Sequence, residues 1–214
     1  MKLYVAQIEC LKDEKTFETY LCKVNEQRRA KVLRCKNKDD QRRSLMAGVL
    51  LRYGLEELGL SYERVEFAVT KEGKPYLKSH PEIFYSLSHS GEYVICMIAD
   101  RNVGADIESN KRKLFQDGNE EKLLALAQKS FSREEYEGLV HLTKKERDEL
   151  FLKLWTRKEA YGKALGQGVW AEMEKNTSID EKYLSFWLEK EYYVSIYCEV
   201  GSLQKEELEI CMMS

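Results

Sequence analysis

The sequence lacks the features that mark membrane-spanning and secreted proteins. Its longest apolar run, YVICMIA at residues 93–99, has the length of a strand and is too short to cross a membrane. The first residues lead straight into LKDEKTFE, without the basic region, apolar region and small-residue cleavage site of a secretory signal. We therefore expect a cytoplasmic protein.

Cysteine spacing also excludes several classes of site. None of the cysteines forms a CxxC pair or has metal-finger spacing, and in a reducing compartment we expect small hydrophobic residues rather than zinc ligands or redox centres. The six cysteines are Cys10, Cys22, Cys35, Cys96, Cys198 and Cys211.

Charge is balanced over the chain but uneven along it. With 214 residues, 34% charged and 43% hydrophobic, and a formal net charge of -2, the chain has an ordinary globular composition and gives no general argument for nucleic-acid binding. The segment QRRAKVLRCKNKDDQRR, residues 27–43, is strongly basic. It is either a solvated helix face or a site for an anionic ligand.

Proline is scarce as well, with only Pro75 and Pro81, so glycine, asparagine and aspartate mark most boundaries between elements. A helix is expected at about 40–58, because apolar residues recur there at helical spacing. Further helices are expected at about 120–129, 132–141 and 145–165. The segments that read as strands are KLYVAQIEC, VEFAVT, FYSLSHS, YVICMIA and VGADIE, with YLSFWLE and YYVSIYCEV pairing as a hairpin across Lys190-Glu191.

This order of elements predicts an α+β fold made of two similar subdomains in a pseudo-twofold relation. Each subdomain is expected to contain an antiparallel sheet packed with a long helix. We place the boundary so that residues 1–102 form the N-terminal subdomain and residues 103–214 the C-terminal one.

The segment VGADIE, residues 103–108, carries two acids in a strand-like context. Side chains two apart share one face of a strand, so Asp106 and Glu108 lie side by side and repel each other. Water or a cation is expected between them. Oxygen ligands in this arrangement suit a hard cation such as Mg²⁺, and the alternative is a solvated strand face.

A second motif, LWTRKEAYGKALGQG, occupies residues 154–168. On a helix Glu159 and Lys163 are i, i+4 neighbours, which by itself indicates an exposed ion pair worth about 0.3 to 0.5 kcal/mol. The ion pair does not account for Gly166 and Gly168, which end the helix in a form that lets a ligand or another chain approach the backbone.

The third motif is SLSHSG, residues 86–91, in which His89 is either a polar site residue or a satisfied structural histidine. A catalytic triad is not expected, because Ser88 and Ser90 lack the G-x-S-x-G elbow and no acid partner is evident.

Taken in order, these motifs resemble those of the 4'-phosphopantetheinyl transferases, of the larger monomeric type that resembles the surfactin-synthetase-activating enzyme. The matching segments are GKP at 73–75, SLSHS at 86–90, VGADIE at 103–108 and WTRKEAYGKALGQG at 155–168, and the resemblance covers about residues 24–170. Ala105, where valine is commoner, and Val169, where leucine is frequent, depart from the pattern without touching a proposed ligand.

The resemblance implies transfer of the 4'-phosphopantetheine group of coenzyme A to a serine of an apo acyl or peptidyl carrier protein, with release of 3',5'-ADP. It implies that Asp106, Glu108 and Glu159 bind Mg²⁺, with Mn²⁺ as the alternative ion. Glu159 is the candidate base, directly or through water. Lys163 would place its ammonium on the transferring phosphate, and His89 would donate to a pyrophosphate oxygen.

The resemblance also gives the basic segment a use as a coenzyme A site. Its cations would contact the 3'-phosphate, the GKP turn would approach the adenine side, and the LSHS and helix residues would contact the rest of the cofactor. The residues carried over as coenzyme A contacts are Arg28, Lys31, Arg43, Gly73, Lys74, Ser88, His89 and Lys163.

The carrier proteins of this family are mostly acidic, which implies a cationic, partly apolar docking surface. We expect it in the segment 109–118, with Lys111, Arg112 and Lys113 beside two apolar residues. Glu135 has two interpretations: a further acid of the metal site or carrier surface, or the last residue of an S-x-x-E capping box that starts a helix.

Two competing functions share the same pocket: a catalytically silent coenzyme A or nucleotide-binding module, and a Mg²⁺-dependent pyrophosphate hydrolase. The first is disfavoured because no acidic or basic residue of the motifs is substituted. Consumption of coenzyme A without a carrier protein would identify the second. The expected state is a monomer, with no nucleic-acid or membrane partner, and the sequence does not specify which carrier pathway is served.

Overall fold

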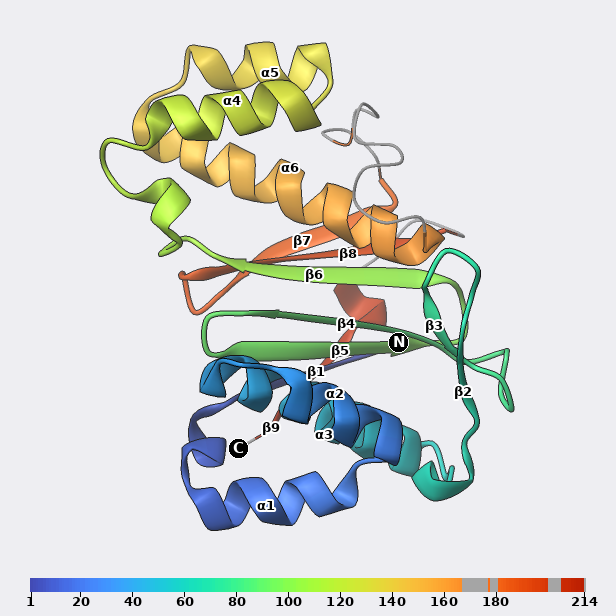
Figure 1. The fold of residues 1–214 in the computed structure, drawn as a ribbon. Coiled ribbons are helices and arrows are strands. Elements are labelled where there is room, and N and C mark those ends of the chain that lie inside the picture. The colour runs from blue at the N-terminus through green and yellow to red at the C-terminus, as the bar shows by residue number, and fades with distance from the viewer. Residues whose placement is uncertain (167–176, 178–180, 200–204, 214) are drawn as a thin grey trace.

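The computed structural model describes residues 1–166, 177, 181–199 and 205–213. It arranges them in four layers, with helices outside and two sheets stacked between them (Figure 1). Each half of the molecule contributes one sheet and its covering helices. The predicted α+β fold of two sheet-and-helix halves is confirmed.

The first half is built on a four-stranded sheet covered by three helices. The strand order is β4 (Phe84–Ser90), β5 (Tyr93–Ala99), β1 (Lys2–Gln7) and β9 (Glu209–Met213). The covering helices are α1 (Glu14–Lys23), α2 (Glu26–Arg34) and α3 (Lys38–Glu57) (Figure 1). Leu45, Leu50 and Leu55 of α3 are fully buried in the core between helices and sheet.

Strand β9 departs from the expected arrangement. It lies near the C-terminus of the chain but pairs in parallel with β1, with Leu3 opposite Ile210. The sheet is therefore mixed rather than purely antiparallel, and residues 209–213 lie in the sheet of the first half. The pairing is non-local, so the sequence pattern around β9 carries no sign of it.

The second half has a three-stranded antiparallel sheet crossed by one long helix. The strand order is β6 (Val103–Ser109), β8 (Tyr192–Cys198) and β7 (Tyr183–Leu188), which confirms the predicted hairpin. The long helix α6 (Lys144–Leu165) covers this sheet, and α4 (Glu120–Ser130) and α5 (Arg133–Val140) pack above it (Figure 1).

A short hairpin and four single turns complete the described chain. The hairpin consists of β2 (Phe67–Val69) and β3 (Pro75–Leu77). The turns are 3₁₀ helices at Glu9–Lys12, Tyr62–Arg64, Lys113–Phe115 and Lys205–Glu207. Within the described part of the chain, no helix has both the length and the apolar character needed to cross a bilayer.

Strand β6 separates an apolar core from the polar site. Val103, Ala105 and Ile107 are fully buried in the core between the two sheets. The alternate residues Gly104, Asp106 and Glu108 therefore share the opposite face of the strand, toward α6. One strand thus contributes both to the core and to the site.

Gly104 sets the distance between β6 and α6. A Cβ atom at this position would lie 1.8 Å from the carbonyl oxygen of Ala160, which is backbone and cannot move aside alone. Small residues on both elements let the helix lie directly on the strand.

We predict that Gly104→Ala lowers the free energy of unfolding by about 3 kcal/mol or more, because the added methyl forces strand and helix apart. Urea unfolding followed by circular dichroism measures the change. Gly138→Ala is the control: no atom lies within 4 Å of its added Cβ, and alanine should stabilise helix α5 by about 0.5 to 1 kcal/mol. Equal stabilities for the two variants would contradict the close packing described.

Candidate active site

Three serines join the two halves of the molecule along β4 and β6. Ser86, Ser88 and Ser90 alternate on β4, so their hydroxyls share one face. The backbone N–H of Ala105 donates to Ser86 Oγ at 2.9 Å, and that of Ser109 donates to Ser90 Oγ at 3.0 Å. Because β4 and β6 are edge strands of different sheets, these hydroxyls satisfy backbone groups that no neighbouring strand pairs. The SLSHS and VGADIE motifs therefore lie side by side.

Asp106 is the point where β4, β6 and α6 meet. Ser88 Oγ and Lys163 Nζ each donate to Asp106 Oδ1 at 2.6 Å. The other oxygen, Oδ2, is buried and accepts no hydrogen bond from any described residue. The side chain is only 5% exposed, which excludes the solvated strand face considered above. A buried carboxylate oxygen without a donor is costly, and a bound cation would relieve that cost.

Glu108, the next residue on the same face of β6, also accepts hydrogen bonds from two side chains. Ser90 Oγ donates to Glu108 Oε2 at 2.8 Å, and Arg112 Nη1 donates to Oε1 at 2.5 Å. Burial, followed by the negative charge of Asp106, raises the pKa of Glu108, while Arg112 opposes the rise. Asp106 and Glu108 therefore repel each other in the folded chain, as predicted.

Glu159 brings a third carboxylate from α6. Burial, followed by the negative charge of Asp106, raises the pKa of Glu159 to about 7. Among the described residues it forms no ion pair with Lys163, whose ammonium bonds to Asp106 and Ser88 instead. The exposed i, i+4 pair suggested by the helix spacing is not formed.

The cluster has the oxygen donors that a hard divalent cation prefers, although its side chains are turned toward other partners. Among the described residues, no group of three or more His, Cys, Asp or Glu side chains is arranged so that it could hold a metal ion. Two of the three acids bond to cationic side chains, Asp106 to Lys163 and Glu108 to Arg112. Mg²⁺ commonly takes only one or two protein carboxylates and completes its shell with phosphate and water oxygens. The unpartnered Oδ2 of Asp106 meets that requirement.

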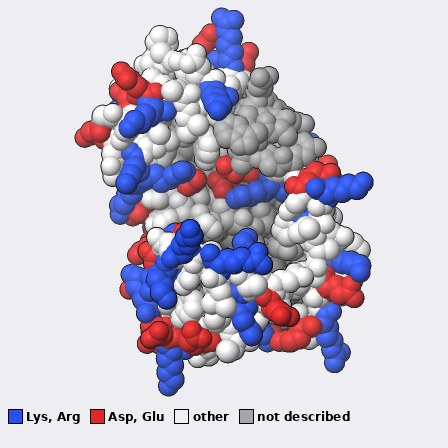
Figure 2. Space-filling view, viewed as in Figure 1, with Lys and Arg blue, Asp and Glu red and all other residues white. Residues whose placement is uncertain are grey.

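A cavity of about 600 Å³ lies beside the cluster, between the two halves. Six of the predicted site residues line it: Arg28, Lys31, Gly73, Lys74, Glu159 and Lys163. Acidic and basic side chains meet across the middle of the face drawn in Figure 2. The cavity is therefore bordered by cations from the first half and by residues of α6 from the second.

The stem of the Arg28 side chain packs against α3 at Gly48, and the residue lines the cavity. A Cβ added at Gly48 would lie 2.7 Å from Arg28 Cγ, so the glycine makes room for the arginine stem. Burial, followed by the charge of Arg28, lowers the pKa of Lys31. Two cations held this close favour an anionic occupant.

Three of the residues predicted to contact coenzyme A, Arg43, Ser88 and His89, lie outside the cavity lining. Arg43 donates to the Gly91 carbonyl oxygen at 2.8 Å and pairs with Asp40 at 2.5 Å. Partial desolvation, then the positive charges of Arg43 and Lys163, lower the pKa of His89. Arg43 and His89 lie near the site, but the structure does not bring Arg43 to Arg28 and Lys31. Gly168 lies outside the described residues.

Glu135 forms the capping box of α5 and is fully engaged. Ser132 N–H donates to Glu135 Oε2 at 2.9 Å, and the backbone N–H of Glu135 donates to Ser132 Oγ at 3.2 Å. Its carboxylate also pairs with the buried Lys158 at 2.8 Å and accepts from Thr177 N–H at 2.6 Å. Of the two interpretations, the capping box is the one the contacts confirm.

Several residues of the site were missed by the sequence analysis. Ser86 and Ser90 were given no role in the site, although their alternation with Ser88 indicated one shared face. Arg112 was assigned to a docking loop, yet it bonds to Glu108. Asn102 accepts a bond from Lys74 at 2.5 Å, a contact between distant segments that no local pattern predicts.

Comparisons with known proteins agree with these motifs. Residues 102–211 match the family described as the 4'-phosphopantetheinyl transferase superfamily, and residues 12–101 match the family described as 4'-phosphopantetheinyl transferase, N-terminal. The chain is 32% identical to 4'-phosphopantetheinyl transferase psf-1 of Bacillus pumilus over 173 residues, covering 79% of this chain and 70% of the relative.

Two further relatives carry similar names. The chain is 29% identical over 170 residues to 4'-phosphopantetheinyl transferase Sfp of Bacillus subtilis strain 168, covering 79% of this chain and 72% of that protein. It is also 29% identical over 179 residues to 4'-phosphopantetheinyl transferase gsp of Aneurinibacillus migulanus, with 83% and 67% covered.

The buried pair of Glu135 and Lys158 allows a test of the structural role of Glu135. We predict that Lys158→Met lowers the free energy of unfolding by about 3 to 5 kcal/mol, because it leaves the buried carboxylate unpaired. Chemical denaturation measures the loss. Lys145→Met, at an exposed position of the same helix, should change stability by less than about 0.5 kcal/mol. A small effect at Lys158 would indicate that Glu135 does not depend on this partner.

Proposed function

The chain belongs to the 4'-phosphopantetheinyl transferase superfamily, and we propose that Asp106, Glu108 and Glu159 form the acidic centre of that transfer. The chain transfers the 4'-phosphopantetheine group of coenzyme A to carrier proteins. The observation that carries the assignment of the site is the buried Asp106 carboxylate, which has one oxygen bonded to Ser88 and Lys163 and the other without a partner.

The reaction begins with a serine hydroxyl of the carrier. Glu159 takes the hydroxyl proton, directly or through water, and its pKa of about 7 suits a general base near neutral pH. The serine oxygen forms a bond to the phosphorus that bears the pantetheine arm. The bond from that phosphorus to the bridging pyrophosphate oxygen breaks, and 3',5'-ADP leaves with the bond's electron pair.

Lys163 and His89 act on the charge that develops. With three N–H donors, Lys163 can keep its bonds to Asp106 and Ser88 and still donate to an oxygen of the transferring phosphate. A neutral His89, favoured by its lowered pKa, can donate one ring N–H to the pyrophosphate. A Mg²⁺ ion held by the three acids would supply neutralisation of the pyrophosphate charge; Mn²⁺ accepts the same ligands.

The first half of the chain, residues 1–102, holds the nucleotide part of coenzyme A in this proposal. Arg28 and Lys31 border the cavity from α2 and would bind the 3'-phosphate. Arg43, which lies outside the cavity lining, would be a further cation for this phosphate. Gly73 and Lys74 line the same cavity from the β2–β3 turn. The second half, residues 103–214, supplies the acids and the catalytic helix.

The carrier protein would dock on the loop that follows β6, whose three cations are not equivalent. Arg112 bonds to Glu108 and Lys111 pairs with Glu191 at 2.5 Å, while Lys113 has no side-chain partner among the described residues. Reversing all three charges would therefore disturb the acidic site as well as docking. Lys113 is the cation best placed to contact an acidic partner.

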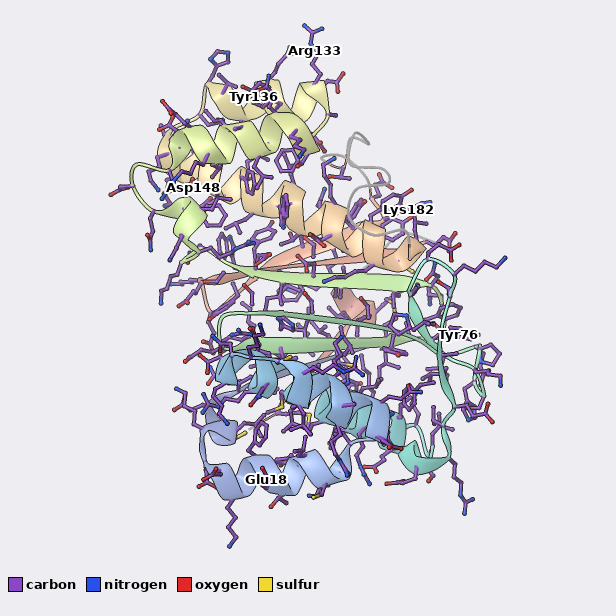
Figure 3. All side chains as sticks on the ribbon, in the orientation of Figure 1. Glu18, Tyr76, Arg133, Tyr136, Asp148 and Lys182 are labelled. Atoms are coloured by element: carbon purple, nitrogen blue, oxygen red, sulfur yellow. The ribbon has the colours of Figure 1, made fainter. Side chains whose placement is uncertain are left out.

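A second cavity supports this docking surface. It measures about 790 Å³ and lies between the loop, the start of α6 and the β7–β8 hairpin. Asp148, on its wall, lies near the N-terminal end of α6 (Figure 3). Its lining includes apolar side chains and three lysines. The lining residues are Asn110, Phe115, Lys144, Lys145, Asp148, Glu149, Leu152, Trp187 and Lys190. The monomeric state and cytoplasmic location stay predictions.

The direct test incubates the protein with coenzyme A, Mg²⁺ and an apo acyl carrier protein or an apo peptidyl carrier domain. Intact-mass spectrometry should show the gain of one phosphopantetheinyl group, lost without metal and in Asp106→Ala. Asp100→Ala, at an exposed acid at the end of β5, is the matched control and should retain activity.

Three outcomes would count against the proposal. Unchanged transfer by Asp106→Ala would remove this residue from the acidic centre. Consumption of coenzyme A without a carrier would favour the pyrophosphate hydrolase. Intact coenzyme A and no mass gain on either carrier would favour a silent binding module.

A further inference from the structure

The ammonium group of Lys74 crosses from the first half of the molecule to the second. Its Nζ donates to the carbonyl oxygen of Ala164 at 2.5 Å and to Asn102 Oδ1 at 2.5 Å. Burial lowers the pKa of Lys74 to about 8. The side chain lines the coenzyme A cavity, yet its polar end is bonded to protein.

The acceptor at Ala164 is one of the last carbonyls of α6. The final four carbonyls of a helix have no N–H partner within the helix, and a lysine near them is favoured by the negative end of the helix dipole. Gly166 closes the helix in the left-handed conformation, with φ 75°. A Cβ at Gly166 would lie 2.7 Å from Lys74 Cβ, so the lysine stem lies directly on this glycine. Lys74 therefore contacts the helix end both by its stem and by its ammonium.

The hairpin that carries Lys74 is itself well held. Thr70 N–H donates to the Lys74 carbonyl oxygen at 2.8 Å, and Lys74 N–H donates to Thr70 Oγ1 at 3.2 Å. Gly73, with φ 91°, provides the left-handed residue that the turn needs. The hairpin reaches the C-terminal end of α6 (Figure 1), whereas Tyr76 on β3 points outward (Figure 3).

The bond from Lys74 to Asn102 also links the lysine to the sheet of the second half, through Glu199. Asn102, which accepts from Lys74, donates through Nδ2 to Glu199 Oε2 at 2.8 Å. The backbone N–H of Glu199 donates to the Asn102 carbonyl oxygen at 3.2 Å. The ammonium thus bridges the end of α6 and the segment that connects the two halves.

We propose that Lys74 is a positioning residue: by capping α6 from the β2–β3 hairpin, it fixes Glu159 and Lys163 relative to the coenzyme A cavity. Glu159 is five residues before Ala164, about 7.5 Å along the helix axis, so a shift of the helix end reaches the acid. The effect of Lys74 on catalysis rests on the proposed function. The stabilisation of the end of α6 by Lys74 does not.

Lys74→Met tests the structural part, because methionine keeps most of the stem and removes the ammonium. Amide hydrogen exchange is measured on the free protein, without coenzyme A, carrier or metal. We expect the last turn of α6 to exchange about tenfold faster, because local opening becomes easier when its cap is lost. Lys71→Met, at an exposed position of the same turn, is the control and should leave this exchange unchanged.

Steady-state kinetics separate positioning from binding. If Lys74 positions the helix, kcat should fall about tenfold with a smaller change in the KM for coenzyme A, because a misplaced catalytic group slows the chemical step. Gly166→Ala should give the same pattern, since its methyl displaces the lysine stem. A raised KM with unchanged kcat and unchanged exchange would show that Lys74 only contacts the cofactor and would overturn the proposal. Faster exchange without transfer activity in the unsubstituted protein would instead count against the proposed function alone.

Discussion

The structure of the site depends on the hydrogen bonds that converge on one oxygen of Asp106. Ser88 reaches this oxygen from the first half, Lys163 reaches it from the long helix, and Asp106 itself belongs to the edge strand of the second sheet. Three elements that are distant in the sequence therefore share one acceptor. A carboxylate that accepts two donors and is almost completely buried cannot be removed without leaving those donors unpaired.

This junction explains why the site lies where the two halves meet. The serines of β4 hold β6 at the edge of the sandwich, and Gly104 lets α6 lie on β6 closely enough for Lys163 to reach Asp106. The cavity opens beside the junction, with basic residues of α2 on one side and Glu159 on the other. In our proposal coenzyme A spans the same boundary, with its nucleotide on the first half and its pyrophosphate at the acids.

Local patterns in the sequence were sufficient to predict most of the fold. The strands at 84–90 and 93–99, the helix that begins at Lys144 and the β7–β8 hairpin all follow from alternation, from the length of an apolar run or from helical spacing. The parallel pairing of β9 with β1 did not, because it joins segments about two hundred residues apart. For the site, the order of the motifs indicated the acids and Lys163 but not their partners.

The partners depend on contacts that only the folded chain contains. Arg112 belongs to a charged loop that matched a docking surface, and its bond to Glu108 arises because the loop turns back at the end of β6. Lys74 was expected at the adenine side, and its bond to the end of α6 depends on where that helix stops. The S-x-x-E pattern at Glu135 was the exception, since a capping box is local and its geometry could be written down from the sequence.

Phosphorus magnetic resonance tests directly whether the acids place a divalent cation at the pyrophosphate of coenzyme A. Mn²⁺ is added to the protein with bound coenzyme A, and the paramagnetic relaxation of each phosphorus is compared with that in Asp106→Ala. If the acids hold the ion there, the two pyrophosphate phosphorus atoms relax much faster than the 3'-phosphate, and Asp106→Ala abolishes the difference. Equal relaxation of all three, or a pattern unchanged in Asp106→Ala, would contradict this placement of the ion.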